Sequence, residues 1–458
     1  MLTAHNTREK GMMRLLPFVM VFILLFPAQF RAAELSDASS ECLDCHASIA
    51  PGMVADWQNS RHARVSPLEG LKKQELERRV SAKWVPSDLV QNVVGCAECH
   101  TLNPEKHSDT FEHNGYQVHI VVTPEDCATC HPVEEKQYGQ NLMSHAYGNL
   151  MNNSLYLDAM QTINGVQFFD DGHLGIKPVS PETSDDSCLS CHGTKVEVKG
   201  FDERDTEMGE MEFPVLSGWP NAGGGRINPD GSRGSCSSCH TWHRFSIEMA
   251  RKPHTCSQCH KGPDVPIYKI YQVSKHGNIY SSIGKKWSFE EVPWTVGEDF
   301  TAPTCATCHV SLVVTPEGDI VAERTHQMNN RLPWRIFGLI YAHAHPKSPD
   351  TSGIMNKSGL PLPTDLNGEP ASTYLIDNNE QQKRRKILQK VCLACHSQQW
   401  VDGHWIRFEN SIRTSNEMTV TATELILKAW EKGVAKGLAQ NDSIFNEKAR
   451  QYMSFAYR

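Results

Sequence analysis

The chain has 458 residues, a formal net charge of −8, 39% hydrophobic residues and a mean hydropathy of −0.46. An acidic chain is poorly suited to binding a polyanion, so the composition argues against nucleic acid as a partner. The unusual part of the composition is its 16 cysteines and 22 histidines, and the arrangement of these residues indicates the class of protein.

The N-terminal residues 1–33 have the pattern of an export signal. Basic residues between positions 8 and 14 precede an apolar run over 15–28, and two alanines follow at Ala32 and Ala33. The run is short for a membrane-spanning helix and suits the apolar part of a secretory signal. We therefore expect residues 1–33 to be a signal peptide, with an uncleaved N-terminal membrane anchor as the alternative.

From residue 34 onward the chain carries eight Cys-x-x-Cys-His motifs, which together use every cysteine. Because none is left over, a disulfide framework is excluded. The pattern is specific for covalent attachment of haem c, in which the trailing histidine is the proximal iron ligand. Paired Cys-x-x-Cys units of zinc sites lack an invariable trailing histidine. The attaching cysteines are Cys42, Cys45, Cys96, Cys99, Cys127, Cys130, Cys188, Cys191, Cys236, Cys239, Cys256, Cys259, Cys305, Cys308, Cys392 and Cys395, and the proximal ligands are His46, His100, His131, His192, His240, His260, His309 and His396.

The segments between the motifs predict a mainly α fold with little regular β structure. Motif spacing is irregular, so the chain is not a solenoid. Residues 68–81 have a helical composition, whereas 219–234 and 345–370 are rich in turn residues. We expect backbone wrapped around haems over a domain at 34–410, with the porphyrins supplying apolar surface that the side chains lack.

After the eighth motif the pattern changes to that of amphipathic helices. Apolar residues recur at three- and four-residue spacing in two stripes, and 441–443 is a plausible break between them. The second stripe is still open at Arg458, so we expect a C-terminal helical segment at 411–458 that is incomplete, with a frayed terminus as the alternative. The stripes are Leu427, Trp430, Val434 and Leu438, then Phe445, Ala449, Tyr452 and Ala456.

A six-coordinate haem needs a second axial ligand, commonly His or Met. Setting aside the motif histidines and His5 leaves thirteen, which is more than seven bis-histidine haems require. Counting alone therefore does not show which iron stays open. The remaining histidines are His62, His107, His113, His119, His145, His173, His243, His254, His276, His326, His343, His345 and His404.

Several stretches resemble the octahaem hydroxylamine oxidoreductase family, and the likeness extends from about residue 40 to 410. They are Trp219 to Ser232, His243 to Ser246, Gly262-Pro263-Asp264, Ile270 to Gly277, and Thr325-His326 with Arg331-Leu332. The resemblance implies seven distal iron ligands, with His254 as a weaker candidate. They are His62, His119, His145, His243, His276, His326 and His404.

In that family the fourth haem is the catalytic one, and Cys188 to Thr194 matches its motif. The resemblance implies protein ligation by His192 on one side only, which leaves the other face open to a small nitrogen-oxide substrate. Asp264 matches a distal acid/base residue that can move protons, although without the resemblance it reads equally well as a turn residue. Tyr341, with His343 and His345, is a further candidate for the pocket.

Two departures leave the direction of the reaction open. Hydroxylamine-oxidising members carry His where this chain has Val265. Their catalytic haem is also cross-linked to a neighbouring subunit's tyrosine, which would lie beyond Arg458. Members without that cross-link look like reductases, which convert nitrite or hydroxylamine to ammonium.

Together these features predict a periplasmic oxidoreductase with eight haem c groups, acting on hydroxylamine at the fourth haem and using seven bis-histidine haems for electron transfer. Its redox partner would be a cytochrome or a quinol-linked membrane protein, and the resemblance implies a homotrimer. The alternatives are the reductive reaction, an electron conduit without a substrate, and an enzyme acting on tetrathionate or sulfite. The Cys-x-x-Cys-Lys motif of the pentahaem nitrite reductases does not occur.

Overall fold

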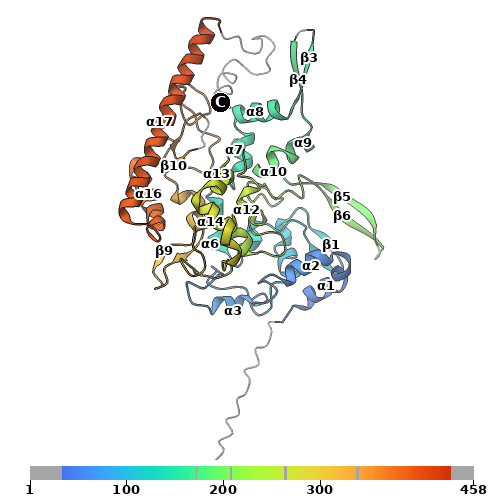
Figure 1. Ribbon diagram of the computed structural model, residues 1–458. Helices are drawn as coiled ribbons and strands as arrows, with labels where there is room; N and C mark the ends of the chain where they lie inside the picture. Colours follow the sequence, from blue (N-terminus) through green and yellow to red (C-terminus); the bar gives the residue numbers. More distant parts are fainter. Residues whose placement is uncertain (1–33, 172, 207–208, 263–265, 337–339, 435–458) are drawn as a thin grey trace, which may run out of the picture. The chain divides into compact units, whose positions relative to one another are not determined.

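The computed structural model describes residues 34–171, 173–206, 209–262, 266–336 and 340–434. This part of the chain is mainly helical, with short helices joined by irregular segments, as the sequence predicted (Figure 1). The α-helices are α1 Asp37–Ile49, α2 Pro51–Gln58, α3 Pro67–Leu71, α4 Ala97–His100, α5 Pro124–Cys127, α6 Pro132–Gly139, α7 Ala146–Met151, α8 Ser154–Asn164, α9 Pro181–Asp186, α10 Cys188–His192, α11 Ile247–Arg251, α12 Pro253–Ser257, α13 Ile267–Val273, α14 Lys275–Ile283, α15 Cys305–His309, α16 Asn378–Leu393 and α17 Gln398–Glu431. Single 3₁₀ turns are η1 Pro104–Lys106, η2 Cys236–Ser238, η3 Gly284–Lys286 and η4 Met328–Arg331.

Several of these short helices begin at residues whose side chains satisfy free backbone N–H groups. Ser66 forms a capping box with Glu69 at the start of α3, and Pro67 occupies the first helical position. Thr123 and Asp126 form the same arrangement at α5. Because such caps are encoded locally, they set where each helix starts even when the helix is only one turn long.

Within the described residues, regular β structure is confined to small sheets, as predicted. Four antiparallel hairpins pair β1 with β2, β3 with β4, β5 with β6, and β10 with β11, and in one three-stranded sheet β7 pairs parallel with β8 while β8 pairs antiparallel with β9. The longest hairpin runs from Glu197 paired with Ser217 to Thr206 paired with Gly209. The strands are β1 Phe111–His113, β2 Tyr116–Val118, β3 Val166–Asp170, β4 His173–Lys177, β5 Glu197–Thr206, β6 Gly209–Ser217, β7 Trp294–Thr295, β8 Val313–Val314, β9 Ile320–Ala322, β10 Trp334–Arg335 and β11 His343–Ala344.

The three-stranded sheet is the centre of the main apolar cluster. Trp294 and Val313 are fully buried, and Phe300 packs against the Trp294 ring with 4.1 Å between centroids. The other apolar clusters of the described chain are smaller. A chain with such modest side-chain cores needs further apolar surface to be stable, which is what covalently bound porphyrins provide.

Two predicted elements differ from the structure in extent. Helix α3 ends at Leu71, although the composition favoured helix to residue 81. The backbone N–H groups of Ser81 and Ala82 instead donate to the Cys130 carbonyl, at 3.2 and 3.1 Å, so this segment is tied to the third motif. The turn-rich stretches 219–234 and 345–370 are irregular, as predicted.

Helix α17 follows the eighth motif and contains Leu427 and Trp430, the first two residues of the first predicted apolar stripe. It runs without interruption through positions 410 and 411, so the proposed domain boundary falls inside a helix, and the division into domains stays a prediction. The second stripe, the break at 441–443 and the signal at 1–33 lie outside the described residues. None of the helices in the described ranges is both long and apolar enough to cross a membrane.

Candidate haem sites

Each Cys-x-x-Cys-His motif folds as one helical turn. The histidine N–H of the second, third, fifth, sixth and eighth motifs donates to the carbonyl of that motif's first cysteine, at 2.8–3.1 Å. The first, fourth and seventh motifs lie inside α1, α10 and α15. Residues three and four apart share a helix face, so both thiols and the imidazole project together. All 16 cysteines are free thiols in the structure, which suits thioether bonds to haem c.

Four proximal histidines face a second histidine at the separation that a shared iron requires. A metal–imidazole bond is about 2 Å long, so two rings on opposite sides of one iron have centres about 6 Å apart. The observed centroid separations are 6.1 Å for His46–His113, 6.4 Å for His131–His62, 6.3 Å for His240–His326 and 6.1 Å for His396–His276. The proximal histidines of the first, third, fifth and eighth motifs therefore each have one histidine opposite, and iron ligation by these four stays a prediction.

Burial keeps the His62 and His326 rings in the neutral form that binds metal. The pKa of His62 is lowered to about 4, mainly by burial and then by His131. The pKa of His326 is also lowered to about 4, by burial and then by His240. Neutral imidazole is the ligating species, so the surroundings favour coordination over protonation.

His113 was not among the distal ligands implied by the resemblance. It ends strand β1, and Asn114-Gly115 follows with φ of 51° and 85° before β2 begins. An Asn-Gly pair in left-handed conformation is the usual turn of a two-residue hairpin. That local signal, visible in the sequence, would have placed His113 at a hairpin turn, but only the fold shows that the turn faces His46.

His119, which was predicted as a distal ligand, lies beside His100 rather than opposite it. The His119 N–H donates to the His100 carbonyl at 2.9 Å, and the His100 Nδ1 lies 2.8 Å from the His119 carbonyl oxygen. Two trans ligands of one iron cannot have their backbones hydrogen-bonded to each other. Both ring nitrogens of His119 are buried without a hydrogen bond, and its ring centroid lies 6.1 Å from that of His100. Ligation of an iron by His119 stays a prediction.

For His145, His404 and His243, which were also predicted as distal ligands, the contacts do not show which proximal histidine each would oppose. The Nε2 atom of His145 lies 3.1 Å from the Gly139 carbonyl oxygen. The His404 ring stacks on Trp400, whose other neighbour is His396. His243 has a left-handed backbone, with φ of 61°. Ligation by these three histidines stays a prediction.

The fourth motif is held by the turn-rich segment that carries much of the family resemblance. The His192 Nδ1 lies 3.3 Å from the Ala146 carbonyl oxygen, which can orient the imidazole. The Asn221 side chain donates to the Leu189 carbonyl at 2.9 Å. Gly193 has φ of 90° and lies directly against the backbone of Arg226. The segment thus packs on α10 so closely that only glycine fits at residue 193.

A cavity of about 210 Å³ opens beside this motif. It has two cationic side chains, from Lys195 and Arg233, and one carboxylate, from Asp350. The pKa of Asp350 is lowered, first by the hydrogen bond from Ser352, and further by His145 and Arg233. The remaining lining includes His145, Tyr147 and Asn149.

The structure places Tyr341 in a buried seam. Its side chain is 1% exposed, and its hydroxyl donates to the Leu366 carbonyl and lies 3.5 Å from the Thr423 Oγ1 of α17. Burial raises the pKa of this phenol. Asp264 and Val265 lie outside the described residues. Catalytic roles for Tyr341 and Asp264 stay predictions.

Thiols from different motifs touch, which shows which attachment sites are neighbours. Cys127 hydrogen-bonds to Cys236, and this contact raises the pKa of Cys127 and lowers that of Cys236. Equivalent contacts join Cys191 to Cys259 and Cys256 to Cys305. The fourth, sixth and seventh motifs therefore form a contiguous series, and the third lies beside the fifth.

Comparison with known proteins agrees with this geometry. Residues 222–334 match a family model described as "Seven times multi-haem cytochrome CxxCH", and residues 36–119 match one for cytochrome c554 and c-prime. A solved structure titled "Hypothetical multiheme protein" is 38% identical, with a TM-score of 0.83, over 93% of this chain and 89% of that chain. The chain belongs to the multihaem cytochromes c.

Two further relatives give this multihaem cytochrome its context. A Kuenenia stuttgartiensis protein named as a probable nitrite reductase–hydroxylamine oxidoreductase fusion protein is 26% identical over 377 residues, or 80% of this chain. The chain spans only 35% of that relative's length. A Kuenenia stuttgartiensis "reducing HAO-like protein complex" shares the fold, with 19% identity and a TM-score of 0.54 over 87% of this chain and 63% of that one.

Proposed function

We propose that this multihaem cytochrome is an octahaem oxidoreductase that acts on hydroxylamine at an open-sided fourth haem. The other seven haems would carry electrons to or from a partner. The observation that carries the proposal is the setting of the fourth motif, which is packed against the 219–234 segment and touches the sixth motif through Cys191 and Cys259. Lys195, three residues after His192, lines a cavity that also carries Arg233.

The ligand set that we propose for the electron-transfer haems follows the opposed pairs. His113, His62, His326 and His276 would serve the first, third, fifth and eighth haems. His145, His243 and His404 remain candidates for the second, sixth and seventh. His119 is replaced by His113, because its backbone is bonded to that of His100.

At the fourth site, bound haem would supply a redox-active, Lewis-acidic iron. The protein's part is to orient His192 through the Ala146 carbonyl and to supply protons beside the substrate. Asp264 is the proposed proton carrier, with Tyr341 as a second candidate. Lys195 and Arg233 would favour an anion in the adjoining cavity.

The same site could run in reverse, reducing nitrite or hydroxylamine to ammonium. Val265 favours this alternative, since it replaces the histidine of oxidising members. The test is turnover by purified holoprotein with an artificial electron acceptor and hydroxylamine, and separately with a reduced mediator and nitrite or hydroxylamine. Turnover lost in the variant D264N supports the proposal, whereas no turnover in either direction rejects it.

An electron conduit is the second candidate, favoured by the contiguous fourth, sixth and seventh motifs. It requires every haem to be six-coordinate and low-spin. A high-spin signal from one haem that shifts when cyanide or hydroxylamine is added would exclude it.

Export to the periplasm fits the maturation of haem c and the pattern at 1–33, and we include it in the proposal. The redox partner would be a cytochrome or a quinol-linked membrane protein, and the assembly a homotrimer. N-terminal sequencing of protein from a periplasmic extract tests export, and sedimentation of the holoprotein tests the trimer.

A further inference from the structure

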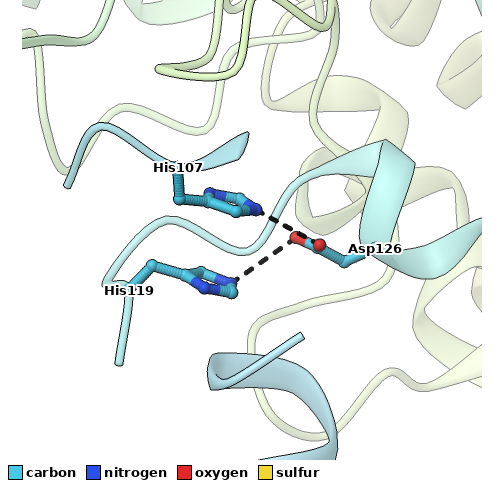
Figure 2. A group of neighbouring side chains, drawn as sticks. All are labelled: His107, His119 and Asp126. Atoms are coloured by element: carbon cyan, nitrogen blue, oxygen red, sulfur yellow. Dashed lines mark hydrogen bonds and ion pairs between the residues drawn. The ribbon is translucent and has the colours of Figure 1, made fainter. Parts of the chain in front are cut away.

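Between the second and third haem motifs lies a cluster of two imidazoles and a carboxylate that the haem sites do not use. Figure 2 shows the His107 and His119 rings stacked, with both directed at Asp126. The three residues are 4%, 0% and 5% exposed, respectively. A nitrogen or oxygen atom from each lies within 4.8 Å of the others.

The spacing of these atoms fits a single small cation. The distance from the His107 Nε2 to the Asp126 Oδ1 is 3.2 Å, and from the His119 Nε2 to the Asp126 Oδ2 it is 3.6 Å. Tetrahedral ligands with bonds of about 2 Å are about 3.3 Å apart. The rings lie 3.6 Å apart at 4°, so one must turn for both nitrogens to converge. His119 has no ring hydrogen bond to lose in turning.

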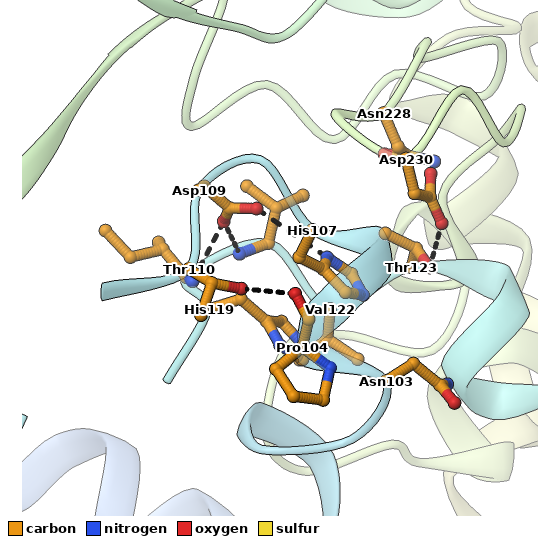
Figure 3. A network of polar contacts seen from close by, with 12 residues as sticks. Asn103, Pro104, His107, Asp109, Thr110, His119, Val122, Thr123, Asn228 and Asp230 are labelled. Atoms are coloured by element: carbon orange, nitrogen blue, oxygen red, sulfur yellow. Dashed lines mark hydrogen bonds and ion pairs between the residues drawn. The ribbon is translucent and has the colours of Figure 1, made fainter. Parts of the chain in front are cut away.

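A second carboxylate and several backbone N–H groups surround the cluster. They hold its side chains in place as the outer hydrogen-bond partners of a metal site do. The Asp109 Oδ1 lies 3.6 Å from the His107 Nδ1, and the Asp109 Oδ2 accepts the N–H groups of Ile120 and Val121 at 2.9 and 2.8 Å (Figure 3). The Asp126 Oδ2 accepts the Thr123 N–H at 2.8 Å. A carboxylate behind a histidine orients the ring and raises its basicity toward a metal.

The buried negative charge of the cluster also favours a bound cation. Asp109 and Asp126 place two carboxylates in the interior, and the Asp109 Oδ1 is buried without a hydrogen bond, as are both nitrogens of His119. Buried carboxylates are costly unless they are paired or bind a metal, and these two share the single imidazole of His107. A dication bound by Asp126 would compensate both charges and give His119 a partner.

We propose that His107, His119 and Asp126 bind one divalent transition-metal cation of the zinc type, distinct from the haem irons. Asp109 orients His107, and a fourth position stays free for water. Since Asp126 directly precedes Cys127, the cation lies next to the third haem attachment site. The proposal is independent of the reaction at the fourth haem.

The experiment uses haem-loaded protein dialysed against a chelator and then titrated with zinc chloride. We expect one zinc per chain by elemental analysis, with a zinc-edge X-ray absorption spectrum showing imidazole ligation. H107Q and D126N should weaken zinc binding at least 100-fold. D109N should weaken it 10–100-fold at the same stoichiometry. The matched control D202N, which changes an exposed aspartate on β5, should bind as the wild type does.

Three results would overturn the proposal. The first is no zinc retained by the wild type, and the second is equal retention by H107Q, D126N and D202N. The third is conversion of one low-spin haem to high spin by H119Q, because it would make His119 an iron ligand. If H107Q and D126N lose haem or fail to fold, the D109N variant provides the test. A zinc affinity of D109N equal to that of D202N would reject the site.

Discussion

His113 and His119 lie six residues apart, and the structure gives them different surroundings. The His113 ring faces His46, whereas the His119 ring is packed between protein groups with its backbone bonded to His100. H113A should therefore convert one haem from low spin to high spin, and H119A should leave the iron spin states unchanged. Electron paramagnetic resonance of the oxidised holoprotein measures both. The reverse pattern would contradict the ligand set proposed here.

Gly193 shows how one residue can position the fourth motif. It combines φ of 90° with direct backbone contact, so a Cβ there would collide with the Arg226 amide. G193A should cost at least about 2 kcal/mol of stability. Chemical denaturation of the holoprotein measures this loss. The control is G52A in helix α2, where an added Cβ meets nothing within 4 Å, and it should not destabilise the protein.

For individual residues, the sequence predicts which cysteines attach haem better than it predicts which histidines bind the iron on the far side. Two thiols and a trailing imidazole must share one helical turn, so Cys188, Cys191 and His192 can be identified without a fold. A distal ligand comes from a distant segment, as His276 does for His396, and no local pattern encodes that approach. The resemblance implied His62, His276 and His326, which the structure places opposite proximal histidines, but it did not include His113, which lies opposite His46.

Among the elements, helix α17 is joined to the segment after residue 340 by polar contacts. The Asn416 side chain accepts from the Ala342 N–H at 3.0 Å and donates to the Ala342 carbonyl at 2.8 Å. The Tyr341 hydroxyl lies 3.5 Å from the Thr423 Oγ1 of α17 and donates a hydrogen bond to the Leu366 carbonyl. Y341F should lower the free energy of unfolding by about 1 kcal/mol, because it removes the hydrogen bond to the half-buried Leu366 carbonyl. An unchanged melting temperature would contradict this, and a large fall in kcat would assign the hydroxyl to the catalytic pocket.

Helix α6 is tied to the segment before His326 by a half-buried ion pair. The Arg324 Nη2 lies 3.2 Å from the Glu134 Oε1. Burial raises the pKa of Glu134, but the Ser81 hydroxyl and Arg324 outweigh it, so the net shift is downward from 4.5. A carboxyl group whose pKa is lowered in the folded state stabilises the fold at pH values above its ordinary pKa. This contribution disappears as the pH falls through the folded-state pKa.

E134Q should therefore reduce stability at neutral pH by about 1 kcal/mol, and the difference from wild type should shrink as the medium is acidified. Circular dichroism melts of both proteins across the acid range measure it. R324Q should reproduce the effect, and the double variant should lose little more. A difference that grew on acidification would contradict the assigned pKa direction.

The fold class followed from the sequence, but the ends of several elements did not. Residues 68–81 have the composition of a helix, yet Ser81 and Ala82 bond to Cys130, and α3 stops at Leu71. Propensity is a weak influence, and packing around a haem motif overrides it. The turn residues of 219–234 are a stronger signal, because glycine and proline restrict the backbone directly.

For the whole molecule, charge governs encounters with a partner. The chain carries a net charge of −8, and haem propionates would add to it. The rate of electron transfer to a basic cytochrome should fall steeply as salt is raised, since screening shortens the range of attraction. Stopped-flow mixing measures the rate, with an uncharged mediator as the control. A salt-independent rate with the basic cytochrome would contradict electrostatic steering.

The contacts between thiols of different motifs bear on how the protein is made. In an oxidising compartment, a chain that folded before receiving haem would hold Cys127 against Cys236 and Cys256 against Cys305. Such neighbours can oxidise to bridges between motifs, and those bridges would block thioether formation. We therefore expect haem attachment to precede tertiary folding, with the cysteines kept reduced and joined to porphyrin while the polypeptide is still open.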